Sequence, residues 1–112
     1  MEITVHTDNN IDRGTVAISR IQVDVGLTEF EDRRMRVEVH LGDESAGRST
    51  GADMRCMLEA RTGGQTPVCV THHANTLDGA INGAVHKLHR LLGSRIGRLE
   101  DRSGRDSIRG RA

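Results

Sequence analysis

Residues 76–99, TLDGAINGAVHKLHRLLGSRIGRL, contain the clearest periodic pattern in the chain. Apolar residues recur there at steps of three and four, which predicts a helix with one buried stripe. The stripe consists of Leu77, Ala80, Ile81, Ala84, Leu88, Leu91 and Leu92. Thr76 is suited to cap this helix, and Asp78 favours its positive N-terminal end. One face of the helix therefore needs a core to pack against.

The opposite face of the same helix is basic. It carries His86, Lys87, His89, Arg90, Arg95 and Arg98, and no acidic residue stands between Asp78 and Glu100. Many solvent-facing helices carry Lys and Arg without binding anything, but they usually also carry Glu for pairing at i, i+4. The absence of such Glu indicates a surface for phosphates. Because the chain has one Phe and neither Trp nor Tyr, a structured RNA fits better than stacked single-stranded bases.

Strands are predicted on the N-terminal side of this helix. Residues 1–7 and 34–41 alternate apolar and polar positions, as strands with one buried face do. Residues 54–61 and 66–72 form two more strands around a Gly63-Gly64 turn. Between these pairs, residues 42–53 are rich in Gly, Ser and Asp and are predicted to form a mobile loop.

Residues 13–30 are ambiguous by pattern. Val16, Val23, Leu27 and Phe30 fit a helix stripe, whereas Ile21, Val23 and Val25 alternate as in a strand. We predict a helix, because about 16 residues without a turn signal exceed the usual strand length.

The predicted order is strand, helix, three strands, helix. This order favours an α+β fold, a βαβββα two-layer sandwich in which both helices cover one face of a four-stranded sheet. The first strand should run parallel to its neighbour, because the chain returns through a helix. The other face should be in solvent and carry Glu2, His6, Arg36, Glu38, His40, Arg55 and Glu59. Residues 1–99 form the domain, and residues 100–112 are predicted to be a disordered Arg-rich tail with one large aliphatic residue, Ile108.

Composition narrows the class of protein. The 112 residues suffice for one domain, and their net charge is zero. That charge is uneven: residues 1–70 hold eight Arg against twelve acids, and residues 71–112 hold eight Lys and Arg against four acids. Two cysteines, no signal segment and no long apolar run indicate a cytoplasmic protein without membrane association. Cys56 and Cys69 are expected to be ordinary thiols.

Motifs for catalysis are missing. The chain has no nucleophile elbow, P-loop or H-E-x-x-H motif, so neither an enzyme nor a small-molecule substrate nor a cofactor is predicted. Six histidines leave a metal alternative, since His72-His73 and His86-x-x-His89 could bring imidazoles together. Lys87 and Arg90 would repel a cation beside the second pair, so no metal site is predicted.

Several stretches resemble the ribosome hibernation-promoting factor and protein Y family. In the basic helix these are Ala80-Ile81-Asn82, Lys87-Leu88, Arg90 and Leu92. RVEVHLGDE, DMRCMLEAR and PVCVTHHANTLDGA resemble a short, single-domain branch of the same family. The resemblance covers residues 1–99 and is weakest before Phe30. It implies a fold like that of double-stranded-RNA-binding domains.

The resemblance also implies a function. Such a factor binds small-subunit rRNA in the channel for mRNA and tRNA and silences translation under stress or in stationary phase. The matching positions for rRNA phosphates are Lys87 and Arg90, with Arg95 and Arg98 by helical continuation and His86 on the same face. Relatives usually carry several Lys and Arg on the first helix as well, where this chain has only Arg13 and Arg20. No C-terminal dimerising domain is present in the 112 residues.

A second hypothesis remains open. The zero net charge and the acidic first-helix region would also suit a protein-interaction module with little or no rRNA binding. A weak homodimer through the open sheet face would favour that hypothesis.

Overall fold

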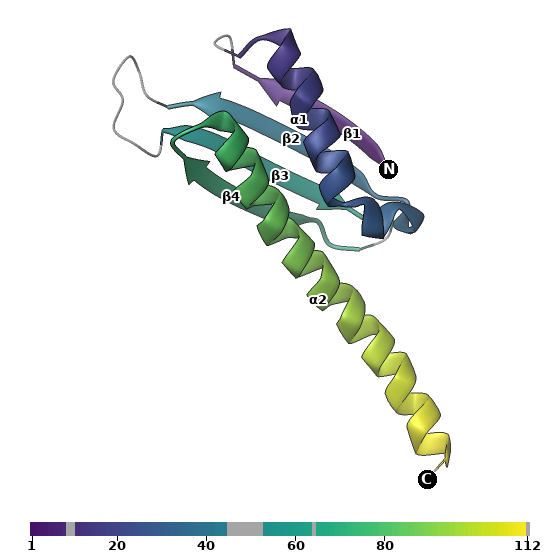
Figure 1. The fold of residues 1–112 in the computed structure, drawn as a ribbon. Helices are drawn as coiled ribbons and strands as arrows, with labels where there is room; N and C mark the ends of the chain where they lie inside the picture. The colour runs from purple at the N-terminus through teal and green to yellow at the C-terminus, as the bar shows by residue number, and fades with distance from the viewer. Residues whose placement is uncertain (9–10, 45–52, 64, 112) are drawn as a thin grey trace.

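Four strands form one sheet in the order β1-β2-β3-β4 (Figure 1). In the computed structural model, residues 1–8, 11–44, 53–63 and 65–111 are described, with side chains outside 31–33 and 98–111. The strands are β1 (Glu2–Thr7), β2 (Arg36–Asp43), β3 (Met54–Arg61) and β4 (Val68–Ala74). β1 pairs in parallel with β2, and the β2/β3 and β3/β4 pairs are antiparallel. The predicted α+β sandwich is confirmed.

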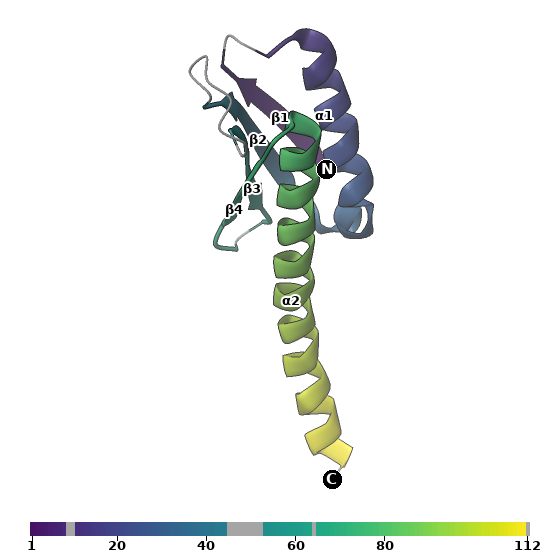
Figure 2. The same ribbon diagram turned by 60° about the vertical axis from the view of Figure 1, so that its left-hand side comes forward.

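Both helices lie on the same side of this sheet (Figure 2). They are α1 (Arg13–Gly26) and α2 (Leu77–Arg111), and a 3-10 helix, η1 (Thr28–Arg33), follows α1. Between helices and sheet lies an aliphatic core. From the sheet it contains Val37, Val39, Leu41, Cys56, Leu58, Ala60 and Val70, and from the helical layer Val23, Leu27, Phe30, Ala80, Ile81, Ala84, Val85, Leu88 and Leu92.

The first helix ends earlier than predicted. The sequence predicted one helix over 13–30, but α1 ends at Gly26 and continues as η1. The Phe30 N–H donates to the Leu27 carbonyl at 2.9 Å, and the Thr28 hydroxyl donates to the Asp24 carbonyl at 2.9 Å. The tighter winding keeps Leu27 and Phe30 both in the core, with exposed fractions of 0% and 4%.

The second helix begins where predicted but is longer. Thr76 accepts a hydrogen bond from the Gly79 N–H at 3.0 Å, so it caps the helix as expected. The helix continues past Leu99 to Arg111, and its C-terminal half projects beyond the sheet (Figure 1). Leu91 is a correction to the predicted stripe, because 46% of it is exposed. The side chains of the predicted tail lie outside the described residues, so its disorder in solution stays a prediction.

The structure describes only part of the predicted loop and turn, and it describes both cysteines. Most of the predicted mobile loop, 45–52, and Gly64 of the predicted turn lie outside the described residues. Cys56 is buried and Cys69 is exposed, and both are free thiols, as expected. Burial raises the pKa of the Cys56 thiol to about 12, which keeps it protonated at neutral pH.

Candidate nucleic-acid interface

The outer side of α2 is positioned by its buried side. Ala80, Ala84 and Leu88 are fully buried against the sheet, which turns the opposite positions toward solvent. His86, Lys87 and Arg90 are accordingly exposed, as predicted. In the described part of the chain, no acidic side chain pairs with Lys87 or Arg90. The two positive charges are therefore available to a polyanion.

Lys87 also holds α2 to the sheet. Its Nζ donates a hydrogen bond to the Thr71 carbonyl of β4 at 2.8 Å. The carbonyl is neutral, so this contact orients the ammonium group without cancelling its charge. Lys87, Arg90 and Ser94 line a groove of about 480 Å³ between α2 and β4. Val70, Thr71 and Leu91 complete the lining, so the groove has cationic walls and a partly apolar floor.

Arg95 lies on a different side of α2 from Arg90. Its guanidinium donates a hydrogen bond to the Thr66 carbonyl, just before β4 begins, and the residue is half-buried. Arg98 follows along the same helix, and its side chain lies outside the described residues. The structure thus brings His86, Lys87 and Arg90 together on the exposed surface and places Arg95 at the edge of the sheet.

His89 is turned toward the first helix. Its Nε2 lies 3.3 Å from Oε2 of Glu29, and its ring centroid lies 5.1 Å from that of Phe30. In the first turn of α2, Asp78 accepts a hydrogen bond from Gln22 of α1 at 2.6 Å. Sequence periodicity could not reveal these partners, because α1 and η1 supply them.

The outer side of α1 differs from that of α2. Arg13 and Arg20 are exposed, as are Ile18, Ile21 and Val25, with exposed fractions of 59%, 61% and 68%. The sequence pattern predicted a helix here, but it did not indicate that Ile18, Ile21 and Val25 face solvent. The outer surface of α1 therefore carries an apolar stripe beside these two arginines.

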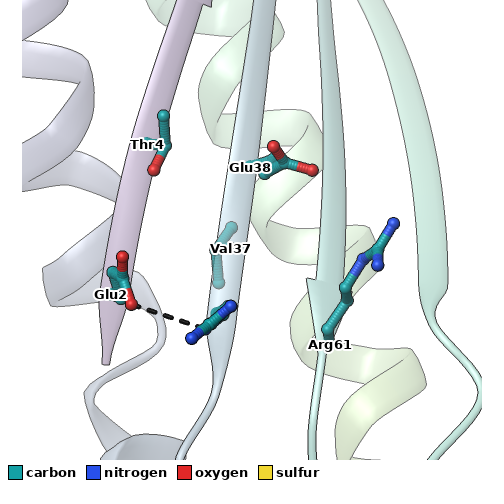
Figure 3. A pocket seen from close by; sticks show the side chains of 6 residues that line it. Glu2, Thr4, Val37, Glu38 and Arg61 are labelled. Atoms are coloured by element: carbon teal, nitrogen blue, oxygen red, sulfur yellow. Dashed lines mark ion pairs between the residues drawn. The ribbon is translucent and has the colours of Figure 1, made fainter.

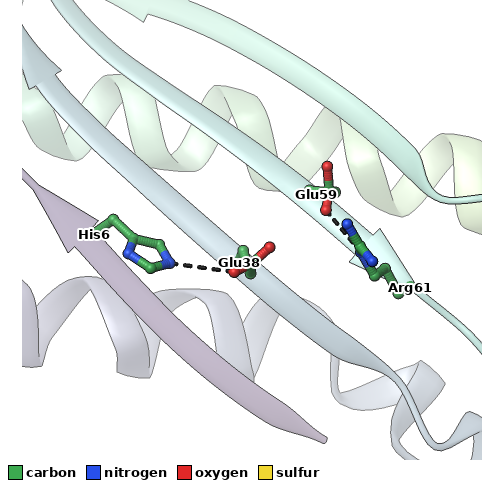
Figure 4. A network of polar contacts seen from close by, with 4 residues as sticks. All are labelled: His6, Glu38, Glu59 and Arg61. Carbon is green, nitrogen blue, oxygen red and sulfur yellow. Dashed lines mark hydrogen bonds and ion pairs between the residues drawn. The ribbon is translucent and has the colours of Figure 1, made fainter.

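The open sheet face is occupied by opposite charges that pair with one another. A hollow of about 310 Å³ lies there among Glu2, Thr4, Arg36, Val37, Glu38 and Arg61, where Arg36 lies 3.4 Å from Glu2 (Figure 3). His6 pairs with Glu38 at 3.3 Å, and Arg61 pairs with Glu59 at 2.8 Å, which raises the pKa of Arg61 (Figure 4). Such pairing leaves this face less attractive to phosphates than α2.

Metal ligands do not converge in the described part of the chain. No group of three or more His, Cys, Asp or Glu side chains there could hold an ion. His72 is half-buried beneath α2, close to Gly83, whereas His73 is exposed and lies 3.5 Å from Glu44. Side chains at neighbouring positions of a strand point to opposite faces of the sheet, so His72 and His73 cannot bind the same metal ion. Among the described helices, none is both long and apolar enough to span a membrane.

The fold has counterparts among solved structures. The N-terminal domain of protein Y from Thermus thermophilus superposes with a TM-score of 0.63 at 19% identity, covering 81% of this chain and 94% of that domain. A ribosomal subunit interface protein from Coxiella burnetii superposes with a TM-score of 0.60 at 13% identity, covering 87% of this chain and 99% of that protein. Comparison by sequence, with family models and with curated proteins, finds no match. At these identities the likeness establishes a shared fold.

Proposed function

We propose that this chain is a ribosome-associated factor of the hibernation-promoting factor and protein Y type. It binds small-subunit rRNA in the cytoplasm, catalyses no reaction, and modulates or silences translation under stress or in stationary phase. The contact surface is the outer side of α2, with His86, Lys87 and Arg90 at its centre. Farther toward the C-terminus, Arg98 adds positive charge along α2, and Arg95 adds it beside the edge of the sheet.

The unpaired charge of Lys87 and Arg90 carries the proposal. Both residues are exposed on α2, and no described carboxylate neutralises them. The same fold occurs in a protein Y domain and in a ribosomal subunit interface protein, which supports the ribosome as the source of the RNA.

The composition indicates how the RNA is read. The one aromatic side chain of the Phe, Tyr and Trp class, Phe30, is 4% exposed and packs in the core. Bases therefore have no such ring to stack on, and recognition rests on phosphates and helix shape. Binding of this kind releases counterions, so its affinity falls steeply with salt.

Co-sedimentation with small ribosomal subunits tests the proposal. The protein should pellet with the subunits at low salt and be released as salt increases, with a slope that falls by roughly 0.7–0.9 for each phosphate contact removed. Arg90→Glu is the cleanest probe, because Arg90 makes no hydrogen bond or ion pair within the described residues. It should weaken binding and flatten the slope without changing the melting temperature. Absence of the protein from the low-salt pellet would refute the proposal.

A protein-interaction module with little rRNA binding is the second candidate. The exposed Ile18, Ile21 and Val25 on α1 favour it, because isolated aliphatic side chains are common at surfaces but a continuous stripe marks a contact site. A protein that self-associates but fails to pellet with small subunits would support this candidate.

A further inference from the structure

The exposed stripe on α1 is regular. Ile18, Ile21 and Val25 are spaced by three and four residues, so they lie along one side of the helix. Leu91 on α2 is the other large hydrophobic residue exposed to a similar degree in the described chain. Three aliphatic side chains in a row leave a patch that gains free energy when another apolar surface covers it.

A groove connects this stripe to the sheet. It has a volume of about 310 Å³ and is lined by Met1, Ile3, Arg20, Ile21 and Asp24. Ile21 belongs to both features, so the stripe and the groove form one surface. Arg20 and Asp24 stand one helical turn apart on that surface, and neither has an ion-pair partner within the described residues.

Strand β1 forms the rim of this surface. It is the end strand of the sheet and pairs only with β2. The Glu2 N–H donates to the Met35 carbonyl at 3.0 Å, on the β2 side. Alternation then turns the peptide groups of Ile3, Val5 and Thr7 to the outer edge. Within the described residues, no side chain forms a hydrogen bond with these peptide groups, whereas Lys87 and Arg95 donate hydrogen bonds to carbonyls at the β4 edge.

We propose that this α1–β1 surface, made of Ile18, Ile21, Val25, Arg20, Asp24 and the outer edge of β1, binds a second copy of the chain. The charges favour that occupant. When two α1 helices meet antiparallel about a twofold axis near Gln22, Arg20 of each faces Asp24 of the other, and Ile18 faces Val25. The surface is thus complementary to itself, as a twofold interface must be.

The dimer is weak and leaves α2 free. Its apolar part consists of three aliphatic side chains and one short groove, whereas each partner in a standard interface buries roughly 800 Å². Lys87 and Arg90 lie outside this surface, on the far side of α2. Self-association is therefore independent of the proposed RNA binding and is tested without RNA.

Sedimentation velocity over the micromolar range, at low salt, tests the inference on the full chain. The wild type should shift from monomer to dimer as its concentration rises. Ile21→Glu should weaken the dimer about a hundredfold, because each copy would bury a charge at the centre of the contact. Leu91→Glu is the matched control and should leave the dimer unchanged.

A charge exchange separates this geometry from unspecific association. Arg20→Asp and Asp24→Arg, made singly, should each weaken the dimer about fivefold to tenfold by placing like charges opposite each other. The double variant should recover wild-type association, because the pairs are restored with reversed sign. A monomeric wild type at all concentrations, or a double variant as weak as the single ones, would overturn the proposal. The circular dichroism spectrum checks that each variant is folded.

Discussion

The two edge strands of the sheet, β4 and β1, are covered in different ways. Beside β4, Lys87 donates to the Thr71 carbonyl and Arg95 donates to the Thr66 carbonyl, so cations from α2 cover the edge. Beside β1, the neighbouring helix offers Ile21 and a shallow groove instead. Lysine and other charged groups at an edge discourage pairing with another strand, whereas an uncovered edge permits it. The same fold therefore presents a cationic surface beside β4 and a largely apolar surface beside β1.

The largest expected effect concerns RNA binding. The double variant Lys87→Glu, Arg90→Glu should lose about a hundredfold in affinity for small subunits, because it replaces two attractive charges by two repulsive ones. The double variant Arg13→Glu, Arg20→Glu on α1 makes the same change in net charge and should lose far less. Filter binding at low protein concentration measures both. Equal losses would show that net charge, and not the α2 surface, controls binding.

The contact between the two helices gives the next effect. A Cβ on Gly26 would lie 2.3 Å from Cγ1 of Val85, so Gly26→Ala forces α1 away from α2. We expect a loss of about 1–3 kcal/mol in the free energy of unfolding, measured with urea.

Gly93→Ala is the matched control for that prediction. Nothing lies within 4 Å of its added Cβ, and alanine favours a helix over glycine by about 1 kcal/mol. This variant should be more stable than the wild type. A stabilised Gly26→Ala variant would mean that α1 and α2 are not in close contact at Gly26 and Val85.

Removing the hydrogen bond between Arg95 and the β4 edge should have a smaller effect on stability. Arg95→Leu keeps much of the apolar stem but removes the hydrogen bond to the Thr66 carbonyl, which should cost about 0.5–1.5 kcal/mol. Urea unfolding measures the loss. Because the edge is then less covered, the variant should also associate more readily than the wild type, which light scattering detects.

The smallest effect is a pH dependence at the start of α1. Asp12 accepts a hydrogen bond from the Thr15 N–H at 2.7 Å, and this backbone hydrogen bond is the main reason that the pKa of its carboxyl lies below the usual 3.8. The cap therefore stabilises the fold above that pH, and this contribution is lost as the pH falls through the lowered pKa. Asp12→Asn keeps a cap without the charge, so its melting temperature should decline less in acid. Parallel decline of both proteins would contradict this role for Asp12.

The sequence predicted most of what depends on neighbouring residues. The alternation of Val37, Val39 and Leu41 predicted a buried strand face, and the spacing of Ala80, Ala84 and Leu88 predicted the buried side of α2. The cap at Thr76 was equally local. Each of these features is set by a period that continues over several residues.

The features that the sequence did not predict depend on contacts between segments that are distant in the chain. Leu91 fits the stripe by spacing, but it lines the groove beside Val70 and is exposed, whereas Leu92 next to it is buried. Arg95 looks like a member of the basic face until Thr66 is placed next to it. Residues 13–30 carried both a helix stripe and a strand alternation, and neither pattern indicated that the side chains of Ile18 and Val25 would be exposed. The candidate surface was therefore predictable as a helix face, but the roles of its residues were not.

The connection of β1 has a consequence for the order of folding. β2, β3, β4 and α2 follow one another along the chain, and each pairs with or packs on its neighbour in sequence. β1 pairs with β2 only across α1 and η1, with Glu2 opposite Arg36, so its contacts close a much longer loop. We expect the C-terminal portion to assemble first and β1 to join last. During synthesis, the strand made first therefore waits longest for its partner, and refolding should show its pairing as the latest event.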